Sequence, residues 1–164
     1  MRVLVISDTH GYAENLGLVL KKAGKIDALI HAGDVEDQEE YIKGMVECPC
    51  YFIAGNNDWG SDLPSDQIIT ISDYRIFLTH GHRYGVSLGI ERLVDEGRSR
   101  NADIVICGHT HKPMIKRVNN IYVINPGSLT YPRQIGRKPT YIIMNINQEH
   151  DIDFSIGQLN IKGR

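Results

Sequence analysis

Five short apolar runs in this chain each end at polar residues of the types that bind metal ions. The polar segments are Asp8-Thr9-His10, His31-Ala32-Gly33-Asp34, Gly55-Asn56-Asn57-Asp58, Thr79-His80-Gly81-His82 and Gly108-His109-Thr110-His111. Their carboxylates, imidazoles and amide oxygens form a mixed ligand set without thiolate, which suits Mn, Fe, Ni or Zn better than Ca. Pairs of such cations, about 3.5 to 4 Å apart, are the usual device for hydrolysing phosphate esters. The residue types therefore indicate metal-dependent chemistry on a phosphate.

The position of these segments, each after a predicted strand, indicates that they share one site. In an open α/β sheet, the loops that leave the carboxyl ends of the strands gather at one edge. Asp8 and His10 are two residues apart, so one extended turn can aim both side chains into the same space. Asp34 adds a second carboxylate, and a carboxylate can bridge two cations because each oxygen has its own lone pairs.

Some histidines of the chain are predicted to lie outside the ligand set. A lone histidine is more often a hydrogen-bonded structural residue, and His31 follows an apolar run, so we expect it to be buried and to support the ligands. His150 lies in a polar turn and is expected to face solvent. For His82, which follows the tight turn that Gly81 allows, contact with substrate and support of the ligands are both open.

Helical and strand patterns alternate in the first two thirds of the chain, and strands dominate the rest. Helices are predicted at residues 12–22, 36–46 and 88–98, and strands at 3–6, 28–30, 51–54, 67–71, 75–79, 114–118, 121–124, 141–146 and 152–156. This order predicts an α/β (α+β) fold, a four-layer αββα sandwich with two mixed β-sheets face to face and helices outside. We expect one sheet to come mostly from the βα units and the other from the carboxyl-terminal strands. The 164 residues are predicted to form a single domain, residues 1–164, with residues 160–164 frayed.

The composition is that of an ordinary globular protein, with 41% hydrophobic and 23% charged residues and a net charge of -2. No apolar run approaches the length of about 20 residues that spans a bilayer, and a cytoplasmic location is expected. Cys48, Cys50 and Cys107 are an odd number, which favours a reducing compartment. No second pair completes a zinc site with Cys48-Pro49-Cys50, so these thiols are expected to be loop or buried residues.

The ordered motifs resemble the signature of calcineurin-like metallophosphoesterases, and the short chain resembles their small bacterial and archaeal phosphodiesterase branch. The matching segments are Asp8-x-His10, Gly33-Asp34, Gly55-Asn56, His80-Gly81-His82, Gly108-His109-x-His111 and Ile124-Asn125-Pro126-Gly127-Ser128. The resemblance implies two divalent cations, Mn in the first place, with Ni, Fe or Zn as alternatives. It assigns one cation to Asp8, His10, Asp34 and His111, and the other to Asp34, Asn56, His80 and His109. It further implies that a hydroxide bridging the two cations attacks a small phosphodiester, with no covalent phosphoenzyme.

Asn57 departs from the pattern of many family members, which have a histidine after the metal-binding asparagine. That histidine contacts the phosphate and can protonate the leaving group, whereas an amide can only donate a hydrogen bond near pH 7. We therefore expect Asn57 to contact the phosphate and the enzyme to prefer esters with good leaving groups. The alternative is that Asn57 only shapes the turn and that His10 or His82 supplies a proton.

Two other classes of function compete with this prediction. The retromer subunit Vps29 shares the fold and a similar histidine pattern but lacks some ligands and acts as a non-catalytic interaction module. A nuclease is the second alternative, although 7% aromatic residues and a net charge of -2 give no evident strand-binding groove. Arg133, Arg137 and Lys138 form a local basic patch that we interpret as a solvated loop. Loops 58–66 and 131–138 are expected to contact the rest of the substrate. Relatives in this branch are often homo-oligomers such as dimers, so a homo-oligomer is possible by analogy.

Overall fold

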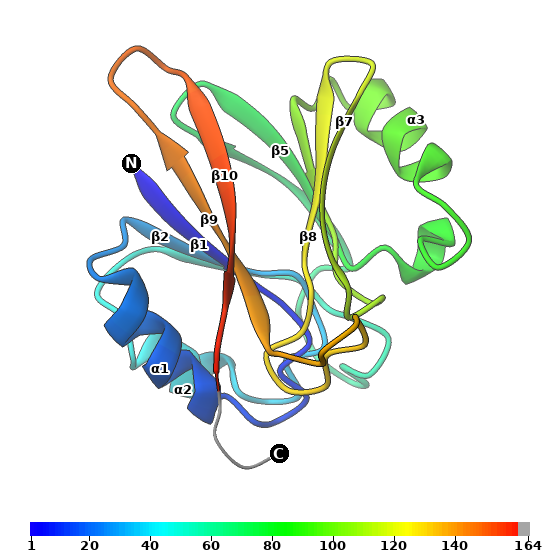
Figure 1. The fold of residues 1–164 in the computed structure, drawn as a ribbon. Coiled ribbons are helices and arrows are strands. Elements are labelled where there is room, and N and C mark those ends of the chain that lie inside the picture. The colour runs from blue at the N-terminus through cyan, green and yellow to red at the C-terminus, as the bar shows by residue number, and fades with distance from the viewer. Residues whose placement is uncertain (161–164) are drawn as a thin grey trace.

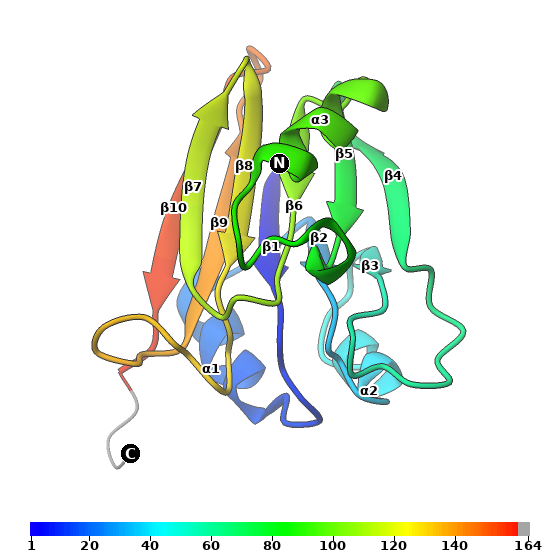
Figure 2. The same cartoon turned by 90° about the vertical axis from the view of Figure 1, so that its right-hand side faces the viewer.

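Two five-stranded sheets form the centre of the computed structural model, which describes residues 1–160 (Figure 1, Figure 2). The first sheet has the order β10-β9-β1-β2-β3, with β1 at Arg2–Ile6, β2 at Ala28–His31, β3 at Cys50–Phe52, β9 at Thr140–Ile146 and β10 at Ile152–Gln158. The second has the order β4-β5-β6-β8-β7, with β4 at Asp66–Ile71, β5 at Tyr74–Thr79, β6 at Ile104–Ile106, β7 at Pro113–Val118 and β8 at Ile121–Pro126. Both sheets are mixed: β1 is parallel to β2 and antiparallel to β9, and β8 is parallel to β6 and antiparallel to β7.

Helices cover the outer face of each sheet, and apolar side chains fill the three spaces between the layers. Helices α1 (Glu14–Ala23) and α2 (Glu39–Lys43) cover the first sheet, and α3 (Glu91–Ser99) covers the second, as Figure 1 shows. Alternate residues of β1 point to opposite faces, so Val3 and Val5 pack between the sheets while Leu4 and Ile6 pack under α1 and α2. The predicted four-layer αββα sandwich is confirmed.

The division of strands between the two sheets differs from the expectation. The carboxyl-terminal strands do not form one sheet, because β7 and β8 pair with β6 whereas β9 and β10 join the first sheet beside β1. The loop between β8 and β9 carries the chain from one sheet to the other. A period-2 pattern indicates which face of a strand is buried but not which strand it pairs with, so the sequence left this choice open.

The helix predicted at residues 36–46 is shorter in the structure and begins only at Glu39. Glu36 and Asp37 have φ values of 52° and 60°, which no right-handed helix accommodates. The helix predicted at 88–98 begins at Glu91, because the backbone N–H of Leu88 closes a turn onto Gly85. Residues 104–106, in the apolar run before Gly108 that was expected to be a strand, form β6.

The three cysteines are free thiols, as expected from the sequence. Cys107 is buried, and Cys48 and Cys50 are half-buried. Burial raises the pKa of the Cys50 thiol to about 11 and that of Cys107 to about 12, so both are protonated near neutral pH. Within residues 1–160, no helix is long and apolar enough to cross a membrane. The predicted fraying of residues 160–164 falls, apart from Asn160, outside the described residues.

Candidate metal centre

The loops after β1, β2, β3, β5 and β6 bring the predicted ligands to one edge of the sandwich. In Figure 2, β1, β5 and β6 run in the same direction toward this edge. Asp8, His10, Asp34 and His111 form the tightest group, since one ligand atom from each lies within 4.8 Å of the others. These residues are up to 103 positions apart in sequence, yet the fold brings them together as the strand-end positions predicted.

Three imidazoles point their Nε2 atoms at two buried carboxylates. His111 Nε2 lies 3.0 Å from Asp8 Oδ1. His80 Nε2 lies 3.4 Å from Asp34 Oδ2, and His10 Nε2 lies 3.7 Å from the same oxygen. Asp8 is fully buried and Asp34 is 1% exposed. Nitrogen and carboxylate oxygen donors therefore converge on a space from which most water is excluded.

The Nδ1 atom of each of these imidazoles faces an oxygen acceptor. His10 Nδ1 lies 2.7 Å from Glu36 Oε1, His80 Nδ1 lies 2.7 Å from the Ala32 carbonyl oxygen, and His111 Nδ1 lies 2.7 Å from the Tyr131 carbonyl oxygen. Because a carbonyl or carboxylate oxygen only accepts, each Nδ1 carries the hydrogen, and in the neutral ring Nε2 has a free lone pair. This is the tautomer that a metal-binding histidine needs.

The arrangement of these lone pairs fits a cation. His10 Nε2 and His111 Nε2 lie 3.2 Å apart, so two lone pairs face each other. Asp8 Oδ1 and His80 Nε2 are buried and have no hydrogen-bond partner among residues 1–160. In the metal-free protein, burial raises the pKa of Asp8, but the contact with the His111 imidazole and the positive charge of His80 when it is protonated lower this pKa below its ordinary value. The residues present therefore offer an ionised carboxylate and free imidazole nitrogens to a divalent metal.

Asn56 and His109 lie beside this group. His109 Nδ1 is 2.8 Å from Asn56 Oδ1, and the ring centroids of His80 and His109 are 5.3 Å apart. The backbone N–H of His109 donates to Asp8 Oδ2 over 3.2 Å, which ties this loop to the first carboxylate. The fold thus brings all seven predicted ligand residues to one place.

The backbone of the ligand-bearing loops is unusual. Asp8, His10, Asp34, His109 and His111 all have φ values between 49° and 67°, in the left-handed region that L residues rarely adopt. Such conformations cluster at functional sites because surrounding contacts must hold them in place. Gly33, with φ of 94°, lies so close to His80 that a Cβ atom would come within 2.6 Å of the imidazole Nδ1. No residue-type pattern in the sequence predicted this strain.

Asp58 holds the loop that carries Asp34, a role that was not predicted from the sequence. One Asp58 oxygen accepts backbone N–H bonds from Val35 and Glu36 over 2.9 and 2.7 Å. The other accepts from Asp34 and Gly55 over 2.8 and 2.6 Å. The carboxylate therefore joins the loop after β2 to the loop after β3, and it positions Glu36, whose side chain holds His10. The only sequence signal was an acidic residue two positions after Asn56.

Asn57 and His82 lie at the margin of the centre. The Asn57 side-chain N–H donates to Asp34 Oδ2 over 2.7 Å, and its backbone N–H donates to Asp34 Oδ1 over 2.8 Å. The His82 ring lies 5.4 Å from the His80 ring and 6.1 Å from the His109 ring, between centroids. Burial, followed by the charges of His80 and His109, lowers the pKa of His82. Its Nδ1 atom is buried and has no hydrogen-bond partner in the described part of the chain.

The comparison with known protein families agrees with this geometry. A profile of the calcineurin-like phosphoesterase superfamily domain matches residues 1–149. The chain belongs to this superfamily. A probable metallophosphoesterase of Mycoplasma pneumoniae is 35% identical over 151 residues, which cover 90% of this chain and 91% of the relative. Phosphodiesterase MJ0936 of Methanocaldococcus jannaschii is 31% identical over 145 residues, covering 77% of this chain and 83% of the relative.

Among solved structures, this member of the superfamily is similar to Vps29 of Entamoeba histolytica in its complex with Zn²⁺. The two structures have a TM-score of 0.76 and 25% sequence identity, and the match covers 98% of this chain and 100% of the Vps29 chain. The fold and the family are therefore those that the ordered motifs predicted.

His31 packs next to the candidate metal ligands and is not one of them. It is fully buried, its Nε2 lies 3.0 Å from Thr9 Oγ1, and its ring stacks on Phe52 with centroids 5.8 Å apart. This placement confirms the prediction of a buried, hydrogen-bonded histidine. His150 is exposed as predicted, and it pairs with Asp73 at 2.6 Å.

The titration of His31 predicts a loss of stability in mild acid. Burial lowers the pKa of His31 from 6.5 to about 4, so the unfolded chain binds this proton first as the pH falls. The stability due to neutral His31 is complete above pH 6.5 and is lost progressively toward pH 4. The loss amounts to about 3 kcal/mol at most. Urea unfolding of the metal-free protein across this pH range should show that the free energy of unfolding falls less steeply for His31→Gln than for the wild type. Parallel curves would contradict the assignment.

Proposed function

We propose that this chain is a metal-dependent phosphodiesterase that hydrolyses a small phosphodiester with two divalent cations in its site. The observation that carries the proposal is the convergence of three imidazole Nε2 atoms on two buried carboxylates, with their Nδ1 atoms held by oxygens. The similarity to proteins called phosphodiesterase and probable metallophosphoesterase supports the reaction class.

The proposed ligand sets are those that the family resemblance implies. One cation would bind Asp8, His10, Asp34 and His111, and the other would bind Asp34, Asn56, His80 and His109. The first set agrees with the group of four residues whose ligand atoms lie within 4.8 Å of one another. Asp34 would be shared, and its two oxygens are oriented by the amide and the backbone N–H of Asn57. Mn is the first candidate, and Ni, Fe or Zn would suit the same nitrogen and oxygen donors.

Two cations, when bound, would lower the pKa of a water molecule and neutralise charge on the phosphate. The protein residues hold the donors in place so that little reorganisation is needed during the reaction. We propose that His82, which is neutral and lies beside His80 and His109, donates a hydrogen bond to a phosphate oxygen. We propose that Asn57, whose amide already touches Asp34, contributes its remaining N–H to the same phosphate.

Metal removal tests the proposed function directly. Protein treated with a chelator should lose hydrolysis of bis(p-nitrophenyl) phosphate, and added Mn²⁺ should restore it. An anomalous-scattering map of Mn-loaded crystals should show two peaks a few ångströms apart beside Asp34. Full activity without metal, or a single peak remote from Asp34, would refute the binuclear site.

The absence of a histidine at position 57 predicts a dependence on the leaving group. Because an amide cannot protonate the departing oxygen near pH 7, phenolate esters should be hydrolysed much faster than alkyl esters. The measurement is kcat/KM across a series of methyl aryl and dialkyl phosphodiesters, and Asn57→His is expected to raise the rate of the alkyl esters. Equal rates for phenolate and alkoxide leaving groups would show that another residue supplies the proton.

A non-catalytic interaction module is the second candidate, because the chain matches Vps29 over 98% of its length. Metal binding alone does not separate the two functions, since that Vps29 structure is itself a complex with Zn²⁺. Catalysis does separate them. An interaction module would bind Mn²⁺ but would not hydrolyse any phosphodiester, so replacing its metal ligands would not alter a hydrolysis rate.

A further inference from the structure

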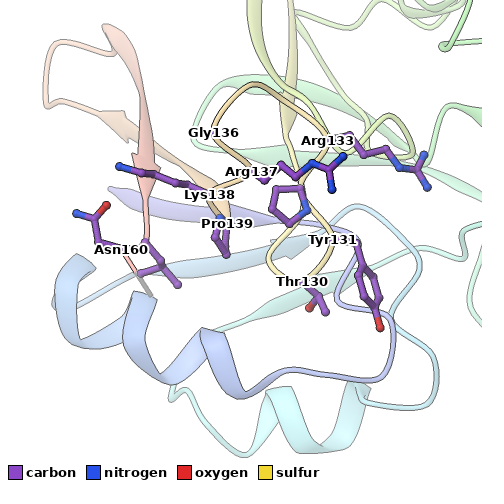
Figure 3. Close-up of a pocket in the computed structure, with 10 residues that line it drawn as sticks. Thr130, Tyr131, Arg133, Gly136, Arg137, Lys138, Pro139 and Asn160 are labelled. Atoms are coloured by element: carbon purple, nitrogen blue, oxygen red, sulfur yellow. The ribbon is translucent and has the colours of Figure 1, made fainter. Parts of the chain in front are cut away.

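A cavity of about 860 Å³ lies between the loop that joins β8 to β9 and the end of β10 (Figure 3). Its buried lining includes Thr130, Pro139 and Leu159. Figure 3 shows Lys138, Pro139 and Asn160 on one side of the space and Thr130 and Tyr131 on the other. The cavity therefore combines an apolar interior with a polar, exposed rim.

Among the described residues, the charged side chains that line this cavity are all basic: Arg133, Arg137 and Lys138. Within residues 1–160, none of them forms an ion pair with a carboxylate. From the sequence, this basic patch is interpreted as a solvated loop. The three side chains are exposed, in agreement with that interpretation, and they also line one cavity in a chain whose net charge is -2. Figure 3 shows Lys138 pointing to one side of the cavity and Arg137 and Arg133 to the other. Such a local excess of positive charge favours an anion.

Hydrogen bonds hold the walls of the cavity in place. The Thr130 hydroxyl donates to the carbonyl oxygens of Thr9 and Tyr12 over 2.9 and 3.1 Å. The backbone N–H of Leu159 donates to the Pro139 carbonyl oxygen over 2.9 Å, which joins the two walls. A site that is already formed loses less conformational entropy when a ligand binds.

The same loop is bonded directly to the candidate metal ligands. The Tyr131 carbonyl oxygen accepts from His111 Nδ1, and the Arg133 backbone N–H donates to the His111 carbonyl oxygen over 3.0 Å. The Tyr131 ring lies 5.4 Å from the His10 ring, between centroids. One aromatic side chain therefore borders both the cavity and the metal centre.

We infer that this cavity binds the part of the substrate beyond the reacting phosphate, and that this part carries its own negative charge on an apolar body. The inference rests on the proposed function. Either Arg137 or Lys138, on opposite sides of the cavity in Figure 3, would bind a carboxylate or a second phosphate, while Pro139 and Leu159 contact the apolar portion. The substrate class is then a phosphodiester, one alcohol of which bears an additional anionic group.

Matched substrates test this inference. Two p-nitrophenyl phosphodiesters would differ only in the end of the second alcohol, which is a carboxylate in one and a carboxamide in the other. A third ester with a terminal phosphonate tests a more highly charged group. The wild type should favour either acid over the amide by about fivefold in kcat/KM. The larger of the two preferences indicates the anionic group. The variant Arg137→Gln/Lys138→Gln should lose the preference, mainly through KM.

The variant Arg92→Gln/Lys116→Gln is the matched control, because it removes two exposed positive charges from other parts of the surface and should keep the preference. Thermal unfolding would establish that both double variants are folded. Equal kcat/KM for the acids and the amide in the wild type would overturn the inference, as would a preference that survives in Arg137→Gln/Lys138→Gln. If the Mn-loaded wild type also fails to hydrolyse bis(p-nitrophenyl) phosphate, the proposed function itself fails, and the inference fails with it.

Discussion

Asp34→Asn is expected to lower kcat/KM for bis(p-nitrophenyl) phosphate with added Mn²⁺ by about 1000-fold, or about 4 kcal/mol of transition-state stabilisation. The substitution keeps the shape of a side chain that is 1% exposed but removes its negative charge. It also puts an amide NH₂ in place of one carboxylate oxygen. Both oxygens accept a hydrogen bond from Asn57, and Oδ2 also faces the imidazoles of His10 and His80. Metal affinity should fall together with activity, which titration calorimetry with Mn²⁺ would measure.

Asp95→Asn is a suitable control for Asp34→Asn. Asp95 lies on α3 with its side chain 73% exposed, so the same change of charge there should leave the rate as it is. An Asp34→Asn protein with the wild-type rate would refute catalysis at this site. The interaction module would then become the better explanation of the fold.

Asp58→Asn is expected to lower Mn²⁺ affinity by 10- to 100-fold, about what is lost when residues that orient metal ligands are replaced. Asp58 accepts hydrogen bonds from four backbone N–H groups, two at each oxygen. An asparagine keeps only one of these oxygens, and its NH₂ group, which is a donor, would face the other two N–H groups. The free energy of unfolding should also fall by about 2 to 3 kcal/mol, because hydrogen bonds to a charged acceptor are lost. Urea unfolding and calorimetric titration of folded protein measure the two effects separately.

Asp62→Asn is the matched control for this substitution, since Asp62 is an exposed carboxylate of the same loop. Asp58→Glu, which keeps the charge but moves the oxygens, should weaken Mn²⁺ binding as well. If Asp58→Asn is destabilised but binds Mn²⁺ with wild-type affinity, Asp58 supports the fold alone and does not position Asp34.

The sequence was informative about the metal centre because ligand type and strand-end position are both local properties. A carboxylate or imidazole after an apolar run is visible in a few residues, and the geometry of α/β sheets places such positions at one edge. The four-layer sandwich and the meeting of the seven candidate ligand residues at one edge were therefore predictable, and the family match and the observed fold agree with the first of these. The ligand assignment stays a prediction that the expected results for Asp34 and Asp58 would test.

Only the tertiary structure decided how the site is held together. Asp58 acts through backbone N–H groups 22 to 24 residues away, and every residue type offers such a donor, so no sequence pattern marks the contact. The partition of the last four strands and the cavity beside Tyr131 likewise depend on long-range pairing. Residue types and their spacing thus determined which atoms could bind a metal. Contacts between distant segments decided how those atoms are oriented and which surface lies beside them.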